Sequence, residues 1–153
     1  MKNIFLLPVV VCLSAIVGCG SNTVTVSGKI VFDGEPGQNI TVLFQGKAVG
    51  NVVPEAAVGQ TDSAGAYSLF LVDSKKKGAM PGEYVVYISW QDPNHDPSVD
   101  IEAADYKFVD KCPYKIPTRA RNGELMFTIP PEGTKEANFE FDSKKESFKP
   151  SGV

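Results

Sequence analysis

The chain has 153 residues, of which 15 are lysine or arginine and 18 are aspartate or glutamate, so its net charge at pH 7 is −3. A mildly acidic chain creates no field that would gather DNA or RNA phosphates, and we expect no nucleic-acid partner. The length is enough for one domain and hardly for two.

The first nineteen residues have the layout of a secretory leader. Lys2 precedes an uncharged apolar run over residues 4–16, which is shorter than the roughly 18 apolar residues of a spanning helix. The run ends in Ile16-Val-Gly-Cys19, which resembles a bacterial lipobox. The resemblance implies cleavage before Cys19, a diacylglyceryl thioether on its sulfur and, in many bacteria, a further acyl chain such as palmitate on its amine. The alternative is an ordinary leader in which this cysteine occurs by chance.

Lipidation would tether the mature protein to a membrane, because two or three acyl chains anchor stably where one holds only marginally. We expect residues 1–18 to be a lipoprotein signal peptide and residues 19–23 to be the lipidated N-terminus and tether. Gly20 stands where inner-membrane lipoproteins commonly have aspartate, which favours the outer membrane, facing the periplasm or the cell surface. Since Cys12 leaves with the leader and Cys19 is acylated, Cys112 has no partner for an intramolecular disulfide.

From Val24 onward, apolar side chains recur at every second position, as in strands with one buried face and one wet face. Asp62 and Gly65 suit a tight reversal, because Asp62 can accept hydrogen bonds from its own downstream backbone and Gly65 can adopt a positive φ. The spacing favours an all-β, antiparallel sandwich of about seven strands over residues 24–142. The expected extended segments are 24–32, 40–44, 59–70 (two pieces around the turn), 83–90, 125–129 and 138–142.

Two segments depart from the strand pattern. Residues 91–122 contain four prolines, and Asp96 as cap with Pro97 in the first turn favours a short helix there, after the N-terminal signal helix. Tyr106 and Phe108 are expected to pin this insertion to the sandwich. The tail over residues 143–153 is polar, and we expect it to be disordered.

Four segments resemble the transthyretin-like, or carboxypeptidase regulatory-like, β-sandwich found in small lipoproteins of planctomycetes. They are VSGKIVFDGEP (26–36), TDSAGAYSL (61–69), GAMPGEYVV (78–86) and ANFEFD (137–142). The resemblance implies an immunoglobulin-like (transthyretin or prealbumin-like) fold and a surface or envelope module with no assigned reaction. Hydroxyisourate hydrolases of this fold use several histidines and a C-terminal Tyr-Arg-Gly-Ser, neither of which is present here.

Catalysis has one candidate pair. His95 is the only imidazole, so it is the only histidine base that could activate Cys112 or a serine. Cys112 beside Pro113 is explained more simply as a small, partly buried apolar residue. We expect no catalytic residues and no cofactor.

A metal site has candidates in Asp92, Asn94, Asp96 and Asp100. The first three alternate like the first ligands of an EF-hand, but Pro97 stands where that loop needs glycine, and no glutamate occupies the twelfth position. A looser surface Ca²⁺ site is one hypothesis. A solvated turn followed by a helix cap is the simpler one.

The remaining signals concern binding. Lys75, Lys76 and Lys77 form a basic cluster that could touch anionic headgroups or acidic glycans, or could be only a solvated hairpin tip. Trp90, Tyr84 and Tyr87 could offer a platform for stacking sugars. Trp90 and Tyr84 share their strand face with the predicted core, however, and only Tyr87 falls on the other face. We expect a non-catalytic, lipid-anchored structural or presentation module whose contacts lie on loops 45–58 and 91–122. The alternative is a carbohydrate-binding or Ca²⁺-assisted ligand-binding module at the cell surface.

Overall fold

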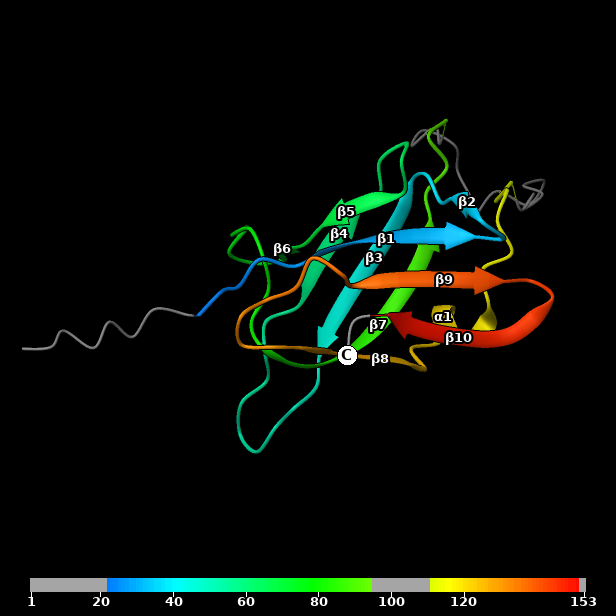
Figure 1. Ribbon diagram of the computed structural model, residues 1–153. Helices are drawn as coiled ribbons and strands as arrows, with labels where there is room; N and C mark the ends of the chain where they lie inside the picture. Colours follow the sequence, from blue (N-terminus) through cyan, green and yellow to red (C-terminus); the bar gives the residue numbers. More distant parts are fainter. Residues whose placement is uncertain (1–21, 95–110, 152–153) are drawn as a thin grey trace, which may run out of the picture.

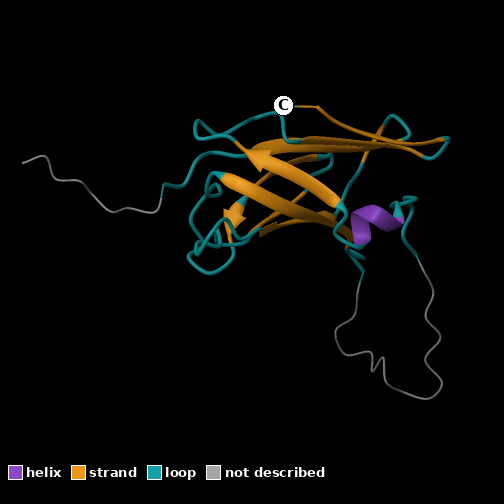
Figure 2. Ribbon diagram, turned by 90° about the horizontal axis from the view of Figure 1, so that it is seen from below, coloured by secondary structure: helices purple, strands orange, loops and turns teal. Residues whose placement is uncertain are grey.

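Alternating apolar residues form two β-sheets that pack face to face, as the computed structural model shows for residues 22–94 and 111–151 (Figures 1 and 2). The all-β sandwich expected from the sequence is therefore present. One sheet has the strand order β10-β9-β1-β2, with β5 also paired to β1, and the other has the order β6-β4-β3-β7-β8. The strands are β1 (Ser27–Phe32), β2 (Glu35–Pro36), β3 (Ile40–Gly46), β4 (Ala57–Gln60), β5 (Ala66–Ser68), β6 (Phe70–Leu71), β7 (Gly82–Trp90), β8 (Leu125–Ile129), β9 (Asn138–Asp142) and β10 (Lys145–Ser151).

The core lies between the two sheets. It is centred on four aromatic rings from both layers, with Phe44 at 5.7 Å from Phe127 and 6.2 Å from Phe139, measured between ring centroids. Edge-on ring contacts of this kind add to the stabilisation from burial alone. The inward faces predicted from the alternation are confirmed, since the buried residues include Val26, Ile30, Ile40, Val42, Phe44, Tyr84, Val86, Ile88, Leu125, Phe127, Ile129, Phe139 and Phe141.

One strand pair corrects the expectation of a wholly antiparallel sandwich. Strands β1 and β9 run parallel, with Ile30 opposite Phe139 and Phe32 opposite Phe141. The chain reaches β9 from β8, which belongs to the other sheet, by a crossing connection over residues 130–137. Because this connection crosses between the sheets, β9 can start at the same end of the sheet as β1 and run in the same direction. A tight hairpin would instead make the two strands antiparallel.

The C-terminal tail corrects a second expectation. Residues 145–151 were expected to be disordered but form β10, which pairs antiparallel with β9. Asp33 accepts a hydrogen bond from the Ser143 N–H at 2.7 Å, which lowers the pKa of the Asp33 carboxyl. Pairing with β10 gives the backbone N–H and C=O groups at the edge of β9 hydrogen-bond partners. The polar sequence of the tail does not indicate this pairing. With β10 included, the described residues contain ten strands, seven of them with four residues or more.

A short helix does occur in the 91–122 segment, as α1 (Thr118–Arg121). The helix expected near Asp96, together with Tyr106 and Phe108, lies outside the described residues. In the described part of this segment, Tyr114 stacks on Phe32 with ring centroids 4.8 Å apart. This contact attaches the insertion to the first sheet.

The loops divide between two ends of the sandwich. We call one the N-terminal end; it consists of segment 22–26 and the loops 47–56, 72–81 and 130–137. Backbone hydrogen bonds join these pieces: Val24 pairs with Ala79, and the Thr134 N–H donates to the Thr25 carbonyl. Helix α1 and the turns 33–34, 61–65 and 143–144 lie at the opposite end, and the two views agree on this separation (Figures 1 and 2).

Candidate functional site

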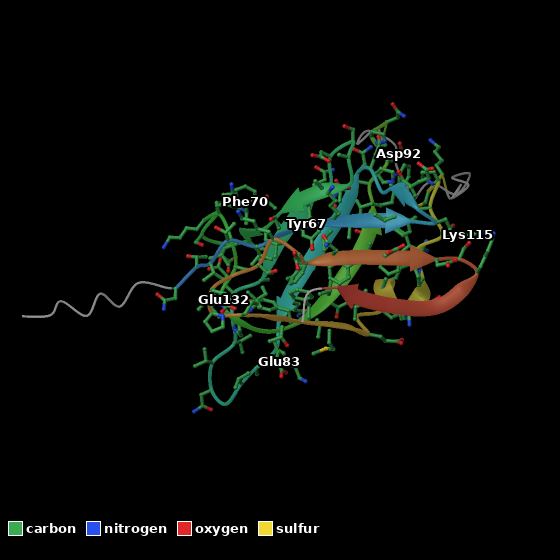
Figure 3. The ribbon with its side chains drawn as sticks, in the orientation of Figure 1. Tyr67, Phe70, Glu83, Asp92, Lys115 and Glu132 are labelled. Atoms are coloured by element: carbon green, nitrogen blue, oxygen red, sulfur yellow. The ribbon has the colours of Figure 1, made fainter. Side chains whose placement is uncertain are left out.

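An open groove of about 1050 Å³ lies where β1 and β5 of one sheet meet β3 and β4 of the other. Its wall includes two residues adjacent in the fold, Tyr67 on β5 and Phe70 on β6, both labelled in Figure 3. Tyr67 is buried, whereas the Phe70 side chain is 43% exposed. The groove therefore offers one accessible aromatic ring.

Three residues of the groove wall, Gln60, Gln91 and Asn138, carry amide side chains, and serine, threonine, lysine and aspartate residues supply its other polar groups. Gln60 donates from Nε2 to the Gln91 Oε1 at 3.3 Å, and the Asn138 Oδ1 accepts from the Lys29 N–H at 2.8 Å. Lys135 also lines the groove. Neutral amides combined with an exposed ring can bind an uncharged, hydroxyl-rich ligand, because amides both donate and accept hydrogen bonds.

Two other polar groups in the groove are committed to the fold. The Tyr67 hydroxyl donates to the Ala137 carbonyl at 2.5 Å, and burial raises the pKa of Tyr67. Asp62 accepts from the N–H groups of Ala64 and Ala66 at 2.8 and 2.9 Å, which confirms the turn predicted there. These two groups hold the groove wall in place.

Of the metal candidates, Asp92 and Asn94 are described; they follow β7 at the end of the sandwich opposite the N-terminal end, where Figure 3 labels Asp92. The Asp92 Oδ1 accepts from the Asn94 N–H at 2.8 Å, and its Oδ2 is 3.5 Å from the Lys111 Nζ. Asp96 and Asp100 lie outside the described residues. Within residues 22–94 and 111–151, no group of three or more histidine, cysteine or acidic side chains is placed to hold a metal ion. Asp92 thus acts as a turn residue with a lysine partner.

The cysteine candidate is partly buried against the core, as expected. The Cys112 Sγ donates to the Tyr114 carbonyl at 3.3 Å. His95 lies outside the described residues, so the pairing of the two stays a hypothesis.

The aromatic residues of β7 are placed largely as predicted. Tyr84 is fully buried and donates to the Met80 carbonyl at 2.8 Å; burial raises its pKa to about 12. Trp90 is partly buried and packs against the core. Tyr87 lies on the other face, where a Cβ on Gly123 would come within 2.5 Å of its ring, so the loop after α1 covers it. These rings do not form an open stacking platform.

The sequence reasoning missed Phe70, although a signal was present. Tyr67, Leu69 and Leu71 alternate inward, and all three are buried. The same alternation places Phe70 outward. An outward phenylalanine beside exposed amides is the feature that could have indicated the groove.

The basic cluster lies at the N-terminal end, on the 72–81 loop. Lys75, Lys76 and Lys77 are all exposed. The Glu55 Oε1 accepts from the N–H groups of Asp73 and Ser74, each at 2.9 Å, and the bond from Ser74 is the main cause of the lowered pKa of Glu55. Glu55 therefore fixes the lysine-bearing loop to the neighbouring 47–56 loop.

Cys19, the predicted lipidation site, lies outside the described residues. Val24, five residues later, already exchanges backbone hydrogen bonds with Ala79, at 2.8 and 3.0 Å. A search of the described residues for a helix long and apolar enough to cross a membrane found none.

No protein-family model matches the chain, and searches of curated proteins and of solved structures likewise returned no match.

Proposed function

We propose that this chain is a non-catalytic lipoprotein of the bacterial cell envelope, anchored to a bilayer by fatty acylation of Cys19. The observation that carries the proposal is the Ile16-Val-Gly-Cys19 sequence at the end of an apolar run too short to span a bilayer. The mature chain begins its folded part almost at once, since Val24 is already paired in the sandwich. A folded body this close to an acylated terminus is held at the membrane surface.

The β-sandwich acts as a structural or presentation module, facing the periplasm or the cell surface from the outer membrane. The two packed sheets support membership of the transthyretin-like or carboxypeptidase regulatory-like class, which the four matching segments suggest. In this proposal the cysteine and tyrosine side chains serve the fold: Cys112 and Tyr67 each donate to a backbone carbonyl. The partner is the bilayer, with an envelope protein or a glycan as a second contact.

The test is fractionation of full-length protein in the cell, comparing wild type with Cys19→Ala and Cys112→Ala. Cys112→Ala is the matched control, because it removes a thiol from the sandwich and leaves the lipobox intact. We expect wild type and Cys112→Ala to enter the membrane fraction and to incorporate a labelled fatty acid, and Cys19→Ala to lose both. Mass spectrometry that finds an unmodified residue 19, or the leader still attached, would refute the proposal.

A second function is favoured by the groove beside Phe70. Its amides and exposed ring suit a neutral glycan, in keeping with the carbohydrate-binding alternative. The test is titration with soluble cell-wall oligosaccharides, followed by amide shifts in NMR spectra. Phe70→Ala should abolish shifts around the groove, whereas Met126→Ala, which removes another exposed apolar side chain, should leave them unchanged. Shifts that survive Phe70→Ala would remove this candidate.

A further inference from the structure

The distance between the lipid anchor and the folded body limits how the sandwich can sit on a membrane; this argument depends on the proposed acylation of Cys19. Five peptide units separate Cys19 from Val24, and an extended chain spans at most about 17 Å over that length. Val24 is fixed to the 72–81 loop by its two hydrogen bonds with Ala79. The Cα of Val24, at the N-terminal end of the sandwich, therefore lies within about 17 Å of the Cα of Cys19.

The 47–56 loop projects from this same end, away from both sheets (Figure 1). Its tip, which we call the valine tip, consists of Val49, Val52 and Val53, whose side chains are 62%, 63% and 63% exposed. Val49 and Val52 exchange backbone hydrogen bonds at 2.9 and 3.3 Å around Gly50, which has φ 62°. The tip is a small hairpin with an apolar surface.

The base of the loop is held in place, so the tip is presented in a fixed direction. The Lys47 N–H donates to the Glu83 carbonyl at 2.9 Å. Pro54 is buried and lies so close to Gly46 that a Cβ there would be 2.2 Å from its carbonyl oxygen. Next to Pro54, Glu55 accepts hydrogen bonds from the N–H groups of Asp73 and Ser74 and from the Ser74 hydroxyl, all on the lysine-bearing loop.

The charges around the valine tip are mixed, with an excess of lysine on one loop. The 72–81 loop carries Lys75, Lys76 and Lys77 against a single acid, Asp73. Lys47 pairs with Glu83 at 3.6 Å. Glu55 on the 47–56 loop lies near Lys76. Two further acids, Glu132 and Glu136, and one further lysine, Lys135, are on the 130–137 loop, and Figure 3 places Glu132 and Glu83 at this end. The three consecutive lysines are thus a concentration of positive charge at the same end of the sandwich as the valine tip.

We infer that the N-terminal end of the sandwich is a bilayer-contacting face, in which the valine tip enters the membrane interface and Lys75–Lys77 contact phosphate headgroups. Apolar side chains rimmed by polar groups mark interaction surfaces. Shallow insertion of apolar side chains combined with lysine attraction to anionic lipid is how interfacial segments bind. The anchor holds the protein at the bilayer, and the tip with the lysines would fix its orientation.

The first test uses full-length lipidated protein in vesicles of phosphatidylcholine and phosphatidylglycerol, in a Cys112→Ala background. An environment-sensitive fluorophore is attached at Val52→Cys or, as the matched control, at Ser63→Cys, which is exposed at the opposite end. We expect a blue shift and quenching by spin-labelled lipid at position 52 only. Equal, water-like emission from both positions in protein that sediments with the vesicles would overturn the inference and leave the anchor proposal intact.

Failure of the protein to sediment with the vesicles would refute the anchor proposal and, with it, this inference. A blue shift at position 52 that appears only after envelope proteins are added would also overturn the inference, because the tip would then be binding a protein partner.

The second test removes the anchor from the comparison, using the mature chain with Cys19→Ser. Its partition onto anionic vesicles should weaken about fivefold for each of the three lysines changed to glutamine. Changing all three valines of the tip to serine should weaken it by roughly tenfold. Changing Met126 and Thr128, which are exposed on β8 and uncharged, to serine is the control and should have no effect. Equal partition of all variants would contradict the inference.

Discussion

The phenol of Tyr67 donates a hydrogen bond to the carbonyl oxygen of Ala137, 2.5 Å away, across seventy residues of sequence. Ala137 ends the connection that crosses from one sheet to the other, and both residues are buried. Gly28 makes the approach possible, because a Cβ on this residue would lie 2.0 Å from the same carbonyl oxygen. This hydrogen bond thus helps to fix the crossing connection on which the parallel β1–β9 pair depends, together with the backbone bonds that Thr134 and Ala137 make to Thr25 and Ser27.

Tyr67→Phe should therefore destabilise the fold by about 1–3 kcal/mol, because it leaves the buried Ala137 carbonyl without its donor. Urea unfolding followed by Trp90 fluorescence measures the change. Tyr114→Phe is the matched control: its hydroxyl accepts from the Gln38 N–H at 2.9 Å at an exposed position, where water can take over the bond. Equal losses for the two variants would contradict the structural role given to Tyr67.

Gly28→Ala should cost about 3 kcal/mol, because the added methyl group meets backbone that cannot move without shifting β9. Gly50→Ala is the control, because it introduces backbone strain without a steric clash. Gly50 has φ 62° and nothing within 4 Å of an added Cβ, so its substitution should cost only about 1–2 kcal/mol. The same unfolding experiment compares the two, and a smaller loss at Gly28 would show that the crossing connection can yield.

Alkaline titration should leave two tyrosines protonated in the native protein. Burial raises the pKa of Tyr84 to about 12 and raises that of Tyr67 as well, whereas the unfolded chain ionises near pH 10. Because the unfolded state loses these protons first, the stability from both groups is complete below pH 10 and falls as the pH rises towards 12. Phenolate absorbance in water and in urea measures this, and Tyr67→Phe or Tyr84→Phe should each remove part of the late ionisation. Full ionisation of native protein at pH 10 would contradict the prediction.

Glu55→Gln should lower the melting temperature at pH 7 but not at pH 3. The hydrogen bond from the Ser74 N–H lowers the pKa of Glu55 below its ordinary 4.5. The stability from its ionised form is therefore present above pH 4.5 and lost as the pH falls through the lowered value. Thermal melts at both pH values measure the difference, with Glu132→Gln on the exposed 130–137 loop as control. A difference from wild type that persists at pH 3 would show that Glu55 acts through something other than its charge.

Calcium at millimolar concentration should leave the melting temperature unchanged, because Asp92 is already engaged with the Asn94 N–H and the Lys111 ammonium. A ligand that binds only the native state must raise the melting temperature as its concentration exceeds the dissociation constant. Full-length wild type and Asp92→Asn are compared with and without chelator. A calcium-dependent rise that disappears in Asp92→Asn would restore the Ca²⁺-assisted hypothesis.

Much of the fold follows from local pattern. A side chain in a strand points to one face or the other with a period of two, so the sequence alone indicates that Val42, Phe44 and Tyr84 are buried. The Asp62–Gly65 turn is equally local, since its hydrogen bonds join residues at most four apart. The proposed lipidation of Cys19 also depends on sequence alone.

The site was harder to predict, because it gathers residues that are distant in sequence. Gln60, Gln91 and Asn138 meet at the groove only through the order of the strands. The valine tip carries no strand or helix signal of its own. Its valines are exposed because the loop between β3 and β4 extends beyond the two packed sheets.

The alternating residues thus determined which faces are buried, because burial follows from the direction of each side chain along a strand. Only the tertiary structure decided which strands are neighbours: β9 runs parallel to β1, and β10 covers the edge of β9. Strand pairing uses backbone N–H and C=O groups, which are the same in nearly all residues. The sequence of one strand therefore does not specify which other strand it pairs with. The choice depends on how the whole chain encloses its core, and that also brings segment 22–26 and the valine tip to one end.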